Sequence, residues 1–300
     1  MEDLKKEIVR RVSEPRILVM DAPRTGPWSN SSLKMLEKCP MFWFLEKVLK
    51  IQAPRDPSSQ TSYLNALGKA AHYLLELRLS GSSKPRALRL VEEQYRLLLP
   101  DTWWIAFHDL IPNVESLLLR IHDFMRKVVV TDILVETKLA FTHDKKAVEF
   151  DDPRAFFRGI IDLTIMVADG RSIIIEHKTG VPARSSLVPF NRQLEGCSSL
   201  LLLGMNPEIK GVQPYLHHIK DGVVRKGRYL PRRTLTDRII PELYHDVSDA
   251  LARVRTEAVF DTRRAGNTLC QYCPYNNICK GRNSFLKREI VPLTGAFLHE

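Results

Sequence analysis

Residues 157–178 read F-R-G-I-I-D-L-T-I-M-V-A-D-G-R-S-I-I-I-E-H-K, and the expected architecture of the chain follows from them. Runs rich in Ile, Val and Thr flank Asp169-Gly170, which predicts two antiparallel strands joined by a tight turn. A two-residue turn would place Asp162 opposite His177. A three-residue turn ending at Gly170 would place Asp162 opposite Glu176. We expect the second register, because it alone gathers one apolar set on one face: Leu163, Ile165, Val167, Ile173 and Ile175.

This register brings two carboxylates together on the other face, with Lys178 two residues beyond Glu176. Cross-strand neighbours lie about 4.5–5.5 Å apart at Cβ, so Asp162 and Glu176 would repel each other without a cation between them. Oxygen ligands suit Mg²⁺ or Mn²⁺, which can activate a bound water, and a lysine can offset charge developing on a phosphate. The alternative is a surface hairpin in which Glu176 forms an ordinary ion pair with Lys178.

Composition and charge limit the kind of protein. The 300 residues can bury a sizeable core, and the net charge of +10 with a pI near 9.4 favours phosphate-rich partners. No apolar run approaches the ~20 residues of a membrane span. The N-terminus lacks the apolar core of a secretory signal. We therefore expect an intracellular, cytoplasmic protein without a membrane partner.

Three further segments are expected around the hairpin. A helix over about 62–79 carries His72, which by itself is more typical of a satisfied helix histidine than of a ligand. The alternating segment 133–142 predicts a strand that places Glu136 near the two carboxylates. A helix over about 189–203 puts Gln193 and Cys197 one turn apart on one face. Gln193 could reach the site or remain an exposed polar residue.

Two short strands are predicted over 211–219 and 222–230, and a basic run begins in the second of them. It could track a phosphate backbone or be a solvated surface, and its members are Arg225, Lys226, Arg228, Arg232 and Arg233.

Cysteines are concentrated near the C-terminus, where Cys270, Cys273 and Cys279 form C-x2-C-x5-C. Such close spacing in an intracellular chain points to zinc or to an iron–sulfur cluster. Both usually take four ligands, so Cys39 or Cys197 is the expected fourth unless a water or a histidine fills the place.

Together these motifs resemble the RecB-like nucleases of the PD-(D/E)xK superfamily that carry an iron–sulfur cluster. That group includes the CRISPR-associated adaptation nuclease, the AddB nuclease domain and related viral single-strand exonucleases. The likeness extends from S-x-S-x-L-x-x-L-x-x-C-P near Ser31 to the final cysteine triplet. It implies a [4Fe–4S] cluster on Cys39, Cys270, Cys273 and Cys279.

The resemblance also implies roles at the hairpin. G-x-x-D corresponds to Gly159 and Asp162, and E-x-K to Glu176 and Lys178. His72, Asp162 and Glu176 would be the metal ligands, and Gln193 would orient substrate. Cys197 stands where the Q-x-x-x-Y motif of these nucleases has tyrosine, which leaves the contact of this helix with DNA open.

The expected fold is α/β, with a mixed central sheet of the restriction-endonuclease type flanked by helices. We expect a helical region over 1–130, a nuclease core over 131–234 and a cysteine segment over 235–300 that packs back on the first region. The expected activity is Mg²⁺- or Mn²⁺-dependent digestion of single-stranded DNA from an end. Alternatives are an end-processing subunit of an integration or recombination complex, and a non-catalytic DNA-binding module. The chain has no P-loop, so unwinding would need a helicase partner.

Overall fold

The fold is described from a computed structural model of residues 1–300. It describes residues 3, 6–7, 27–48, 50–51, 60–179, 188–254, 273 and 275. None of the helices within these ranges is both long and apolar enough to cross a membrane.

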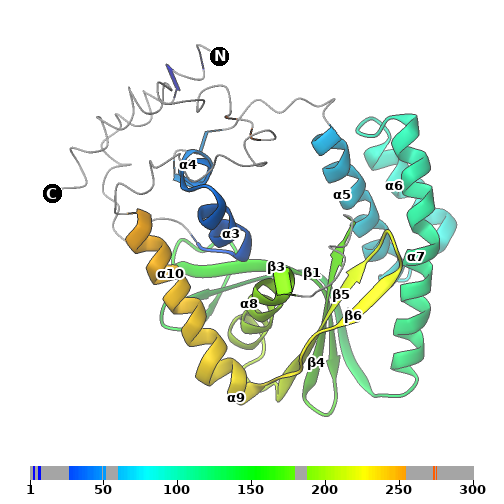
Figure 1. The fold of residues 1–300 in the computed structure, drawn as a ribbon. Helices are drawn as coiled ribbons and strands as arrows, with labels where there is room; N and C mark the ends of the chain where they lie inside the picture. The colour runs from blue at the N-terminus through cyan, green and yellow to red at the C-terminus, as the bar shows by residue number, and fades with distance from the viewer. Residues whose placement is uncertain are drawn as a thin grey trace. The chain divides into compact units, whose positions relative to one another are not determined.

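A seven-stranded mixed sheet forms the centre of the fold (Figure 1), in the order β2-β1-β3-β4-β5-β6 with β7 paired to β5. β3 and β4 form an antiparallel hairpin, whereas β4 and β5 run parallel. This confirms the expected α/β class with a mixed sheet flanked by helices. The strands are β1 (Val130–Thr142), β2 (Ala147–Val148), β3 (Ala155–Val167), β4 (Arg171–Lys178), β5 (Gly211–His218), β6 (Val223–Lys226) and β7 (Leu230–Pro231).

The hairpin adopts the register expected from the apolar pattern. Leu163 pairs with Ile175 and Ile165 with Ile173, which corresponds to a three-residue connection. Gly170 has a φ of 88°, a left-handed conformation that glycine adopts without steric cost. The paired segment ends at Leu163–Ile175, and continuing its register by one residue on each strand would place Asp162 beside Glu176.

Three helices cover one face of the sheet: α5 (Gln60–Leu79), α6 (Lys84–Tyr95) and α7 (Asp101–Met125). Their buried stripes, which include Leu74, Val91 and Phe107, form one apolar cluster with Leu163 and Ile175 of the hairpin. This cluster fixes the position of α5 against the sheet, and therefore the position of His72.

The helix α8 (Val188–Gly204) joins β4 to β5 and packs on the opposite face, against β1, β4 and β5. A parallel pair needs such a crossover connection. Gly159 of β3 lies under this helix, and a Cβ at that position would lie only 2.6 Å from Leu200 Cδ1. Earlier in α8, Gln193 and Cys197 contact Glu176 near the end of β4.

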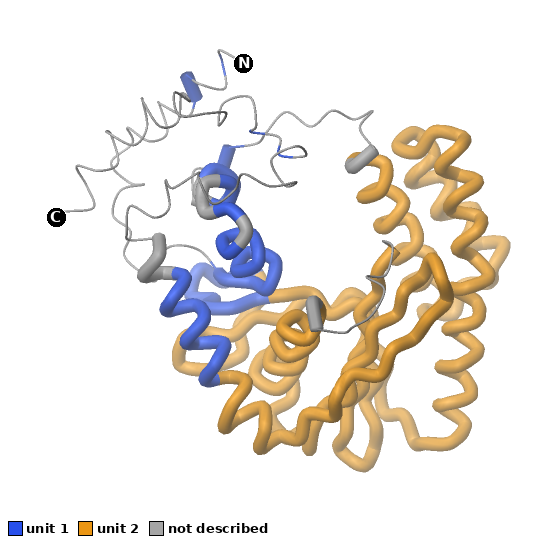
Figure 2. The backbone as a smooth tube through the Cα atoms, viewed as in Figure 1, with its two compact units in different colours: residues 1–55, 151–158, 241–300 blue, residues 56–150, 159–240 orange. Residues whose placement is uncertain are grey.

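The chain divides into two compact units (Figure 2), comprising residues 1–55, 151–158 and 241–300 and residues 56–150 and 159–240. The division into 1–130, 131–234 and 235–300 expected from the sequence stays a prediction. In the first unit the Trp28 and Trp43 rings stack with centroids 5.3 Å apart. The remaining helices are α3 (Asn30–Lys38), α4 (Pro40–Trp43), η2 (Phe44–Val48), α9 (Arg232–Thr234), η3 (Leu235–Ile239) and α10 (Ile240–Val254).

Candidate active site

Asp162 lies where β3 and β4 continue beyond their paired segment. Its Oδ2 accepts a hydrogen bond from the backbone N–H of His177 at 2.6 Å, and its Oδ1 lies 3.7 Å from His72 Nδ1. Burial raises the pKa of the Asp162 carboxyl well above its ordinary value, and the nearby Glu176 carboxylate raises it further. The site therefore holds a carboxylate in an environment that favours a neutralising cation.

His72 reaches the sheet from the middle of α5. One turn earlier, a Cβ at Gly68 would lie 3.1 Å from Thr179 Oγ1, so glycine allows a close approach of the helix to the end of β4. His72 Nδ1 lies 3.2 Å from Glu136 Oε1. Burial lowers the pKa of His72, but the Glu136 hydrogen bond and the Asp162 charge outweigh it, so the net pKa is raised. His72 is therefore held between two carboxylates.

Glu136 has an unusual backbone for a residue inside a strand. Its φ is 48°, in the left-handed region, which costs a residue other than glycine roughly 1–3 kcal/mol. Val135 packs on the α5–α7 cluster, whereas Leu139 Cβ lies 3.2 Å from where a Cβ at Gly204 of α8 would be. Because alternate residues of a regular strand share a face, the alternation must break between Val135 and Leu139. Such a break at Glu136 would account for the turn of its carboxylate toward His72.

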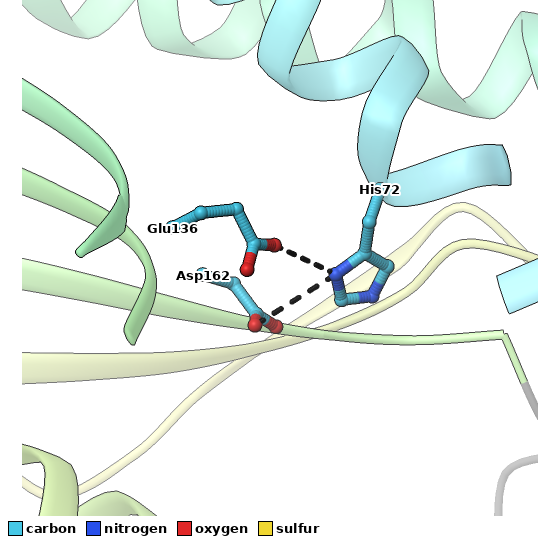
Figure 3. A group of neighbouring side chains, drawn as sticks. All are labelled: His72, Glu136 and Asp162. Atoms are coloured by element: carbon cyan, nitrogen blue, oxygen red, sulfur yellow. Dashed lines mark hydrogen bonds and ion pairs between the residues drawn. The ribbon is translucent and has the colours of Figure 1, made fainter. Parts of the chain in front are cut away.

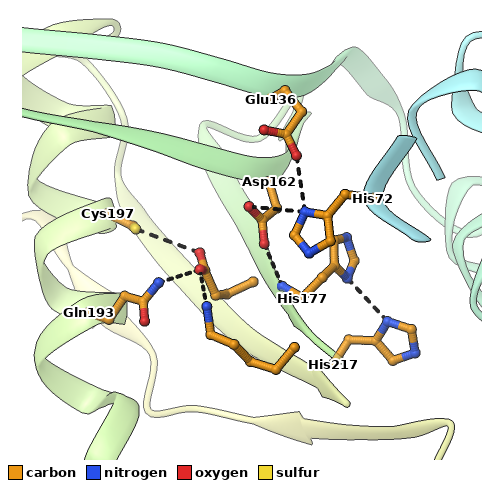
Figure 4. A network of polar contacts seen from close by, with 9 residues as sticks. His72, Glu136, Asp162, His177, Gln193, Cys197 and His217 are labelled. Carbon is orange, nitrogen blue, oxygen red and sulfur yellow. Dashed lines mark hydrogen bonds and ion pairs between the residues drawn. The ribbon is translucent and has the colours of Figure 1, made fainter. Parts of the chain in front are cut away.

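Glu176 is buried, with 5 % of its surface exposed, and its carboxylate contacts residues of α8. Lys178 Nζ is 2.6 Å from its Oε1, and Gln193 Nε2 of α8 donates to the same oxygen (Figure 4). Cys197, one turn further along α8, has its Sγ 3.9 Å from Oε2. The strand lysine and both helix residues singled out in the sequence therefore meet at one carboxylate.

A group of possible metal ligands is formed by His72, Glu136 and Asp162 (Figure 3), whose donor atoms lie within 4.8 Å of one another. One imidazole nitrogen and two carboxylates make a donor set that suits a divalent ion such as Mn²⁺ or Mg²⁺. The expected ligand Glu176 is not part of this group and bonds instead to Lys178 and Gln193. Glu136 lies near His72 and Asp162, as the strand pattern led us to expect of a residue near the site.

Comparison with known proteins identifies the family. The sequence profile of the PD-(D/E)XK nuclease superfamily matches residues 27–280, most of the chain. The chain belongs to this superfamily. No curated protein matches the sequence as a relative.

Two solved structures resemble the chain weakly. A protein from Eubacterium rectale described as a "Putative exonuclease" aligns with 91 % of this chain and 96 % of its own, at 13 % identity and a TM-score of 0.45. SSO0001 aligns with 72 % of this chain and 96 % of its own, at 15 % identity and a TM-score of 0.30. Membership of the PD-(D/E)XK superfamily therefore rests on the profile match.

Next to Glu176 and Lys178 in β4, a histidine forms a contact with a second histidine that the sequence did not suggest. His177 of β4 and His217 of β5 pair in register, and their Nδ1 atoms lie 3.1 Å apart. Burial is the main cause that lowers the pKa of both rings, that of His217 to about 4. When both rings are neutral, one Nδ1 donates and the other accepts in this contact. The motif E-H-K shows the spacing of Glu176 and Lys178, but nothing in the sequence pairs the histidine between them with a residue forty positions away.

The five basic residues expected to bind nucleic acid differ in their surroundings. Glu176 pairs with Leu216 and Leu216 with Arg225, so Arg225 lies in the same cross-strand row as Glu176. Lys226 belongs to the neighbouring row and points to the other face. Arg232 pairs with Glu208 and Arg233 with Asp237, each at 3.3 Å, and Arg228 is exposed.

The cysteines are described only in part, because Cys270 and Cys279 lie outside the described residues. Cys39 follows α3, and its Sγ accepts a hydrogen bond from the N–H of Phe42 at 3.4 Å. The ring of Tyr275, two residues after Cys273, lies 5.6 Å from that of Phe42. The Tyr275 hydroxyl donates to Ile51 O at 2.6 Å. The residue between the second and third C-terminal cysteines thus lies against the segment that follows Cys39.

Proposed function

We propose that the chain is a metal-dependent exonuclease of the RecB-like iron–sulfur type that digests single-stranded DNA from an end. The observation that carries this proposal is the arrangement of Asp162, Glu176 and Lys178. The hairpin register, continued by one residue, would place Asp162 beside Glu176. Lys178 Nζ lies 2.6 Å from Glu176 Oε1. Membership of the nuclease superfamily supports the reaction class.

The donor set supports the metal. His72 and Asp162 would hold a divalent cation together with Glu136, which lies in the same donor group, and with Glu176, whose charge acts on the Asp162 carboxyl. The imidazole nitrogen favours Mn²⁺ over Mg²⁺, because Mg²⁺ prefers an all-oxygen octahedron. When bound, such an ion lowers the pKa of a water and offsets charge on a phosphate oxygen.

The protein side chains have separate roles in this proposal. The Lys178 ammonium stabilises negative charge as it develops on the phosphate. Gln193 holds Glu176 in place from α8, and the His177 N–H holds Asp162 from the next strand. Arg225, in the row of Glu176, binds the phosphate backbone of the strand together with the basic residues that follow it. A helicase, recombinase or integrase partner would supply free ends inside the cell.

The proposed [4Fe–4S] cluster joins Cys39 to Cys270, Cys273 and Cys279. Support comes from Tyr275, which ties the C-terminal cysteine segment to Phe42 and Ile51. The N–H donated to Cys39 Sγ is of the kind that stabilises a thiolate ligand and tunes a cluster. In this arrangement the cluster closes a loop of more than two hundred residues and acts structurally.

Digestion of end-labelled oligonucleotides tests the proposal. The full chain is purified anaerobically and given single-stranded or duplex DNA labelled at either end, with Mn²⁺, Mg²⁺ or a chelator. We expect metal-dependent shortening of the single strand from one end, and its loss in Lys178→Ala. Activity that persists in that variant or in chelator would overturn the mechanism, and cuts that begin internally would overturn the exonuclease assignment.

A further inference from the structure

Cys197 occupies a specific place above the proposed active site. It lies in α8, is 3 % exposed, and has its Sγ 3.9 Å from Glu176 Oε2. The RecB-like resemblance offers no role for it, because those nucleases have tyrosine at this position. It is buried among core residues of α8, and its thiol also contacts a carboxylate.

The two oxygens of Glu176 have different partners. Oε1 accepts from the Lys178 ammonium and from the Gln193 amide, both strong donors. Oε2 is contacted in the described part of the chain by the Cys197 thiol. A thiol is a weak donor, so Oε2 keeps lone pairs that a cation can use. Oε1 therefore accepts two strong hydrogen bonds, whereas Oε2 has lone pairs left for a cation.

The neighbouring residues of α8 show why a thiol differs here from a hydroxyl. Ser198 Oγ donates to Leu194 O at 2.7 Å, and Ser199 Oγ donates to Glu195 O at 3.0 Å. Both hydroxyls therefore bond to the carbonyl four residues earlier, which serine and threonine commonly do in helices. A serine at position 197 would have the Gln193 carbonyl available in the same way. Its proton would then point along the helix and away from Glu176.

We propose that Cys197 is a positioning residue for Glu176. The Cys197 thiol orients Glu176 Oε2 toward the divalent cation and leaves that oxygen able to bind the cation. This inference rests on the proposed function, because it assigns Glu176 to the metal. A cysteine thiol with an ordinary pKa of about 8.5 is protonated at neutral pH, so it has a proton to donate. The thiol acts on the cation only through the carboxylate.

The test compares Cys197→Ser and Cys197→Ala with Ser198→Ala in the full chain. Ser198 is a matched control, since it is a buried small polar residue next to Cys197 whose hydroxyl bonds to Leu194 O rather than to Glu176. Mn²⁺ binding is measured directly by electron paramagnetic resonance without DNA. Nuclease activity is then measured over a range of Mn²⁺ concentrations, and thermal unfolding shows whether each variant is folded.

We expect the Mn²⁺ dissociation constant to rise about two- to fivefold in both Cys197 variants, as for loss of one weak hydrogen bond. The kcat at saturating Mn²⁺ should stay close to that of the unmodified chain, because bound metal itself orients Glu176. Ser198→Ala should bind Mn²⁺ normally. The proposal is overturned if the Cys197 variants bind Mn²⁺ like the Ser198 control, or if only kcat falls.

Direct binding separates this inference from the proposed function. If the chain binds Mn²⁺ and the Cys197 variants bind it more weakly, but none digests DNA, the nuclease proposal fails and the positioning role stands. If the chain digests DNA and the variants bind Mn²⁺ as tightly as the unmodified chain, only the positioning role fails.

Discussion

Lys178 Nζ lies 2.6 Å from Glu176 Oε1, two residues along the same strand, with the carboxylate buried and the lysine partly exposed. This ammonium is the positive charge that the proposed mechanism uses. We expect Lys178→Ala to lower kcat by about a hundredfold or more, the usual cost of removing a preorganised charge-stabilising group. Lys210→Ala is the matched control, because Lys210 lies against Gly170 at the turn end of the hairpin. Equal kcat values for the two variants would contradict the role of Lys178.

Glu136 allows a test that separates backbone strain from metal binding. Glu136→Gly should relieve the left-handed backbone and raise the melting temperature by a few degrees above that of Glu136→Gln, which keeps the strain. Both variants should lose much of the stabilisation that Mn²⁺ gives to the unmodified chain, because both lack the carboxylate. Thermal unfolding with and without Mn²⁺ measures both effects.

A second left-handed residue provides the control for Glu136. Lys145 has a φ of 65° in the turn between β1 and β2. Lys145→Gly should raise the melting temperature while leaving the Mn²⁺ shift intact. A Glu136→Gly variant that is less stable than Glu136→Gln would show that the left-handed conformation is not a source of strain.

The buried His217 predicts a loss of stability in mild acid. Its pKa is about 4 in the folded chain, lowered mainly by burial and next by Arg120, against about 6.5 in the unfolded chain. Between these values the unfolded state binds more protons, so the free energy of unfolding falls as the pH drops from about 6.5 to about 4. His217→Asn should flatten this dependence. Urea unfolding at several pH values measures it, and parallel curves for the two proteins would refute the assignment.

The cysteines predict a pattern of bound iron. Cys39→Ser and Cys273→Ser should each lower bound iron, acid-labile sulfide and visible absorption in anaerobically purified protein. Cys197→Ser should keep all three, because Cys197 contacts Glu176. If the unmodified protein contained zinc instead of iron, the cysteines would form a zinc site and the cluster prediction would be wrong. Loss of iron in the Cys197 variant would contradict the assignment of the four cluster ligands.

Arg225 and Lys226 are adjacent cations that point to opposite faces of β6, and only Arg225 shares the row of Glu176. Arg225→Ala should weaken binding of single-stranded DNA and reduce the salt dependence of binding by about one phosphate contact. Lys226→Ala removes the same charge and should have a smaller effect. Fluorescence anisotropy at several salt concentrations compares them. Equal losses would mean that general charge, rather than the Glu176 face, attracts the strand.

The hairpin register could be predicted because side chains alternate along a strand. A slip of one residue would have mixed Leu163 and Ile175 with the polar set, so one apolar pattern was enough to choose. The placement of Gln193 and Cys197 on one face of α8 followed in the same way from helical spacing. These local periodicities account for the contacts of Glu176.

The contacts of Glu136 and His217 could not be predicted from such patterns. The left-handed backbone at Glu136 depends on packing against two different helical layers. No residue type near Glu136 indicates that the alternation of side chains along the strand is interrupted there. The His177–His217 contact depends on the parallel register of β4 and β5 across the intervening helix. Both features arise from tertiary structure, on which single-sequence reasoning has little information.

The glycine at position 159 has a consequence for how this site can change. A Cβ there would lie 2.6 Å from Leu200 Cδ1, so alanine would require the Leu200 side chain, or the crossover helix that carries it, to shift. Gln193 and Cys197 belong to the same helix, so a shift of the helix would change both of their contacts to Glu176. The absence of a side chain at position 159 leaves room for Leu200, so a substitution there can alter the surroundings of Glu176 without replacing any residue that contacts it.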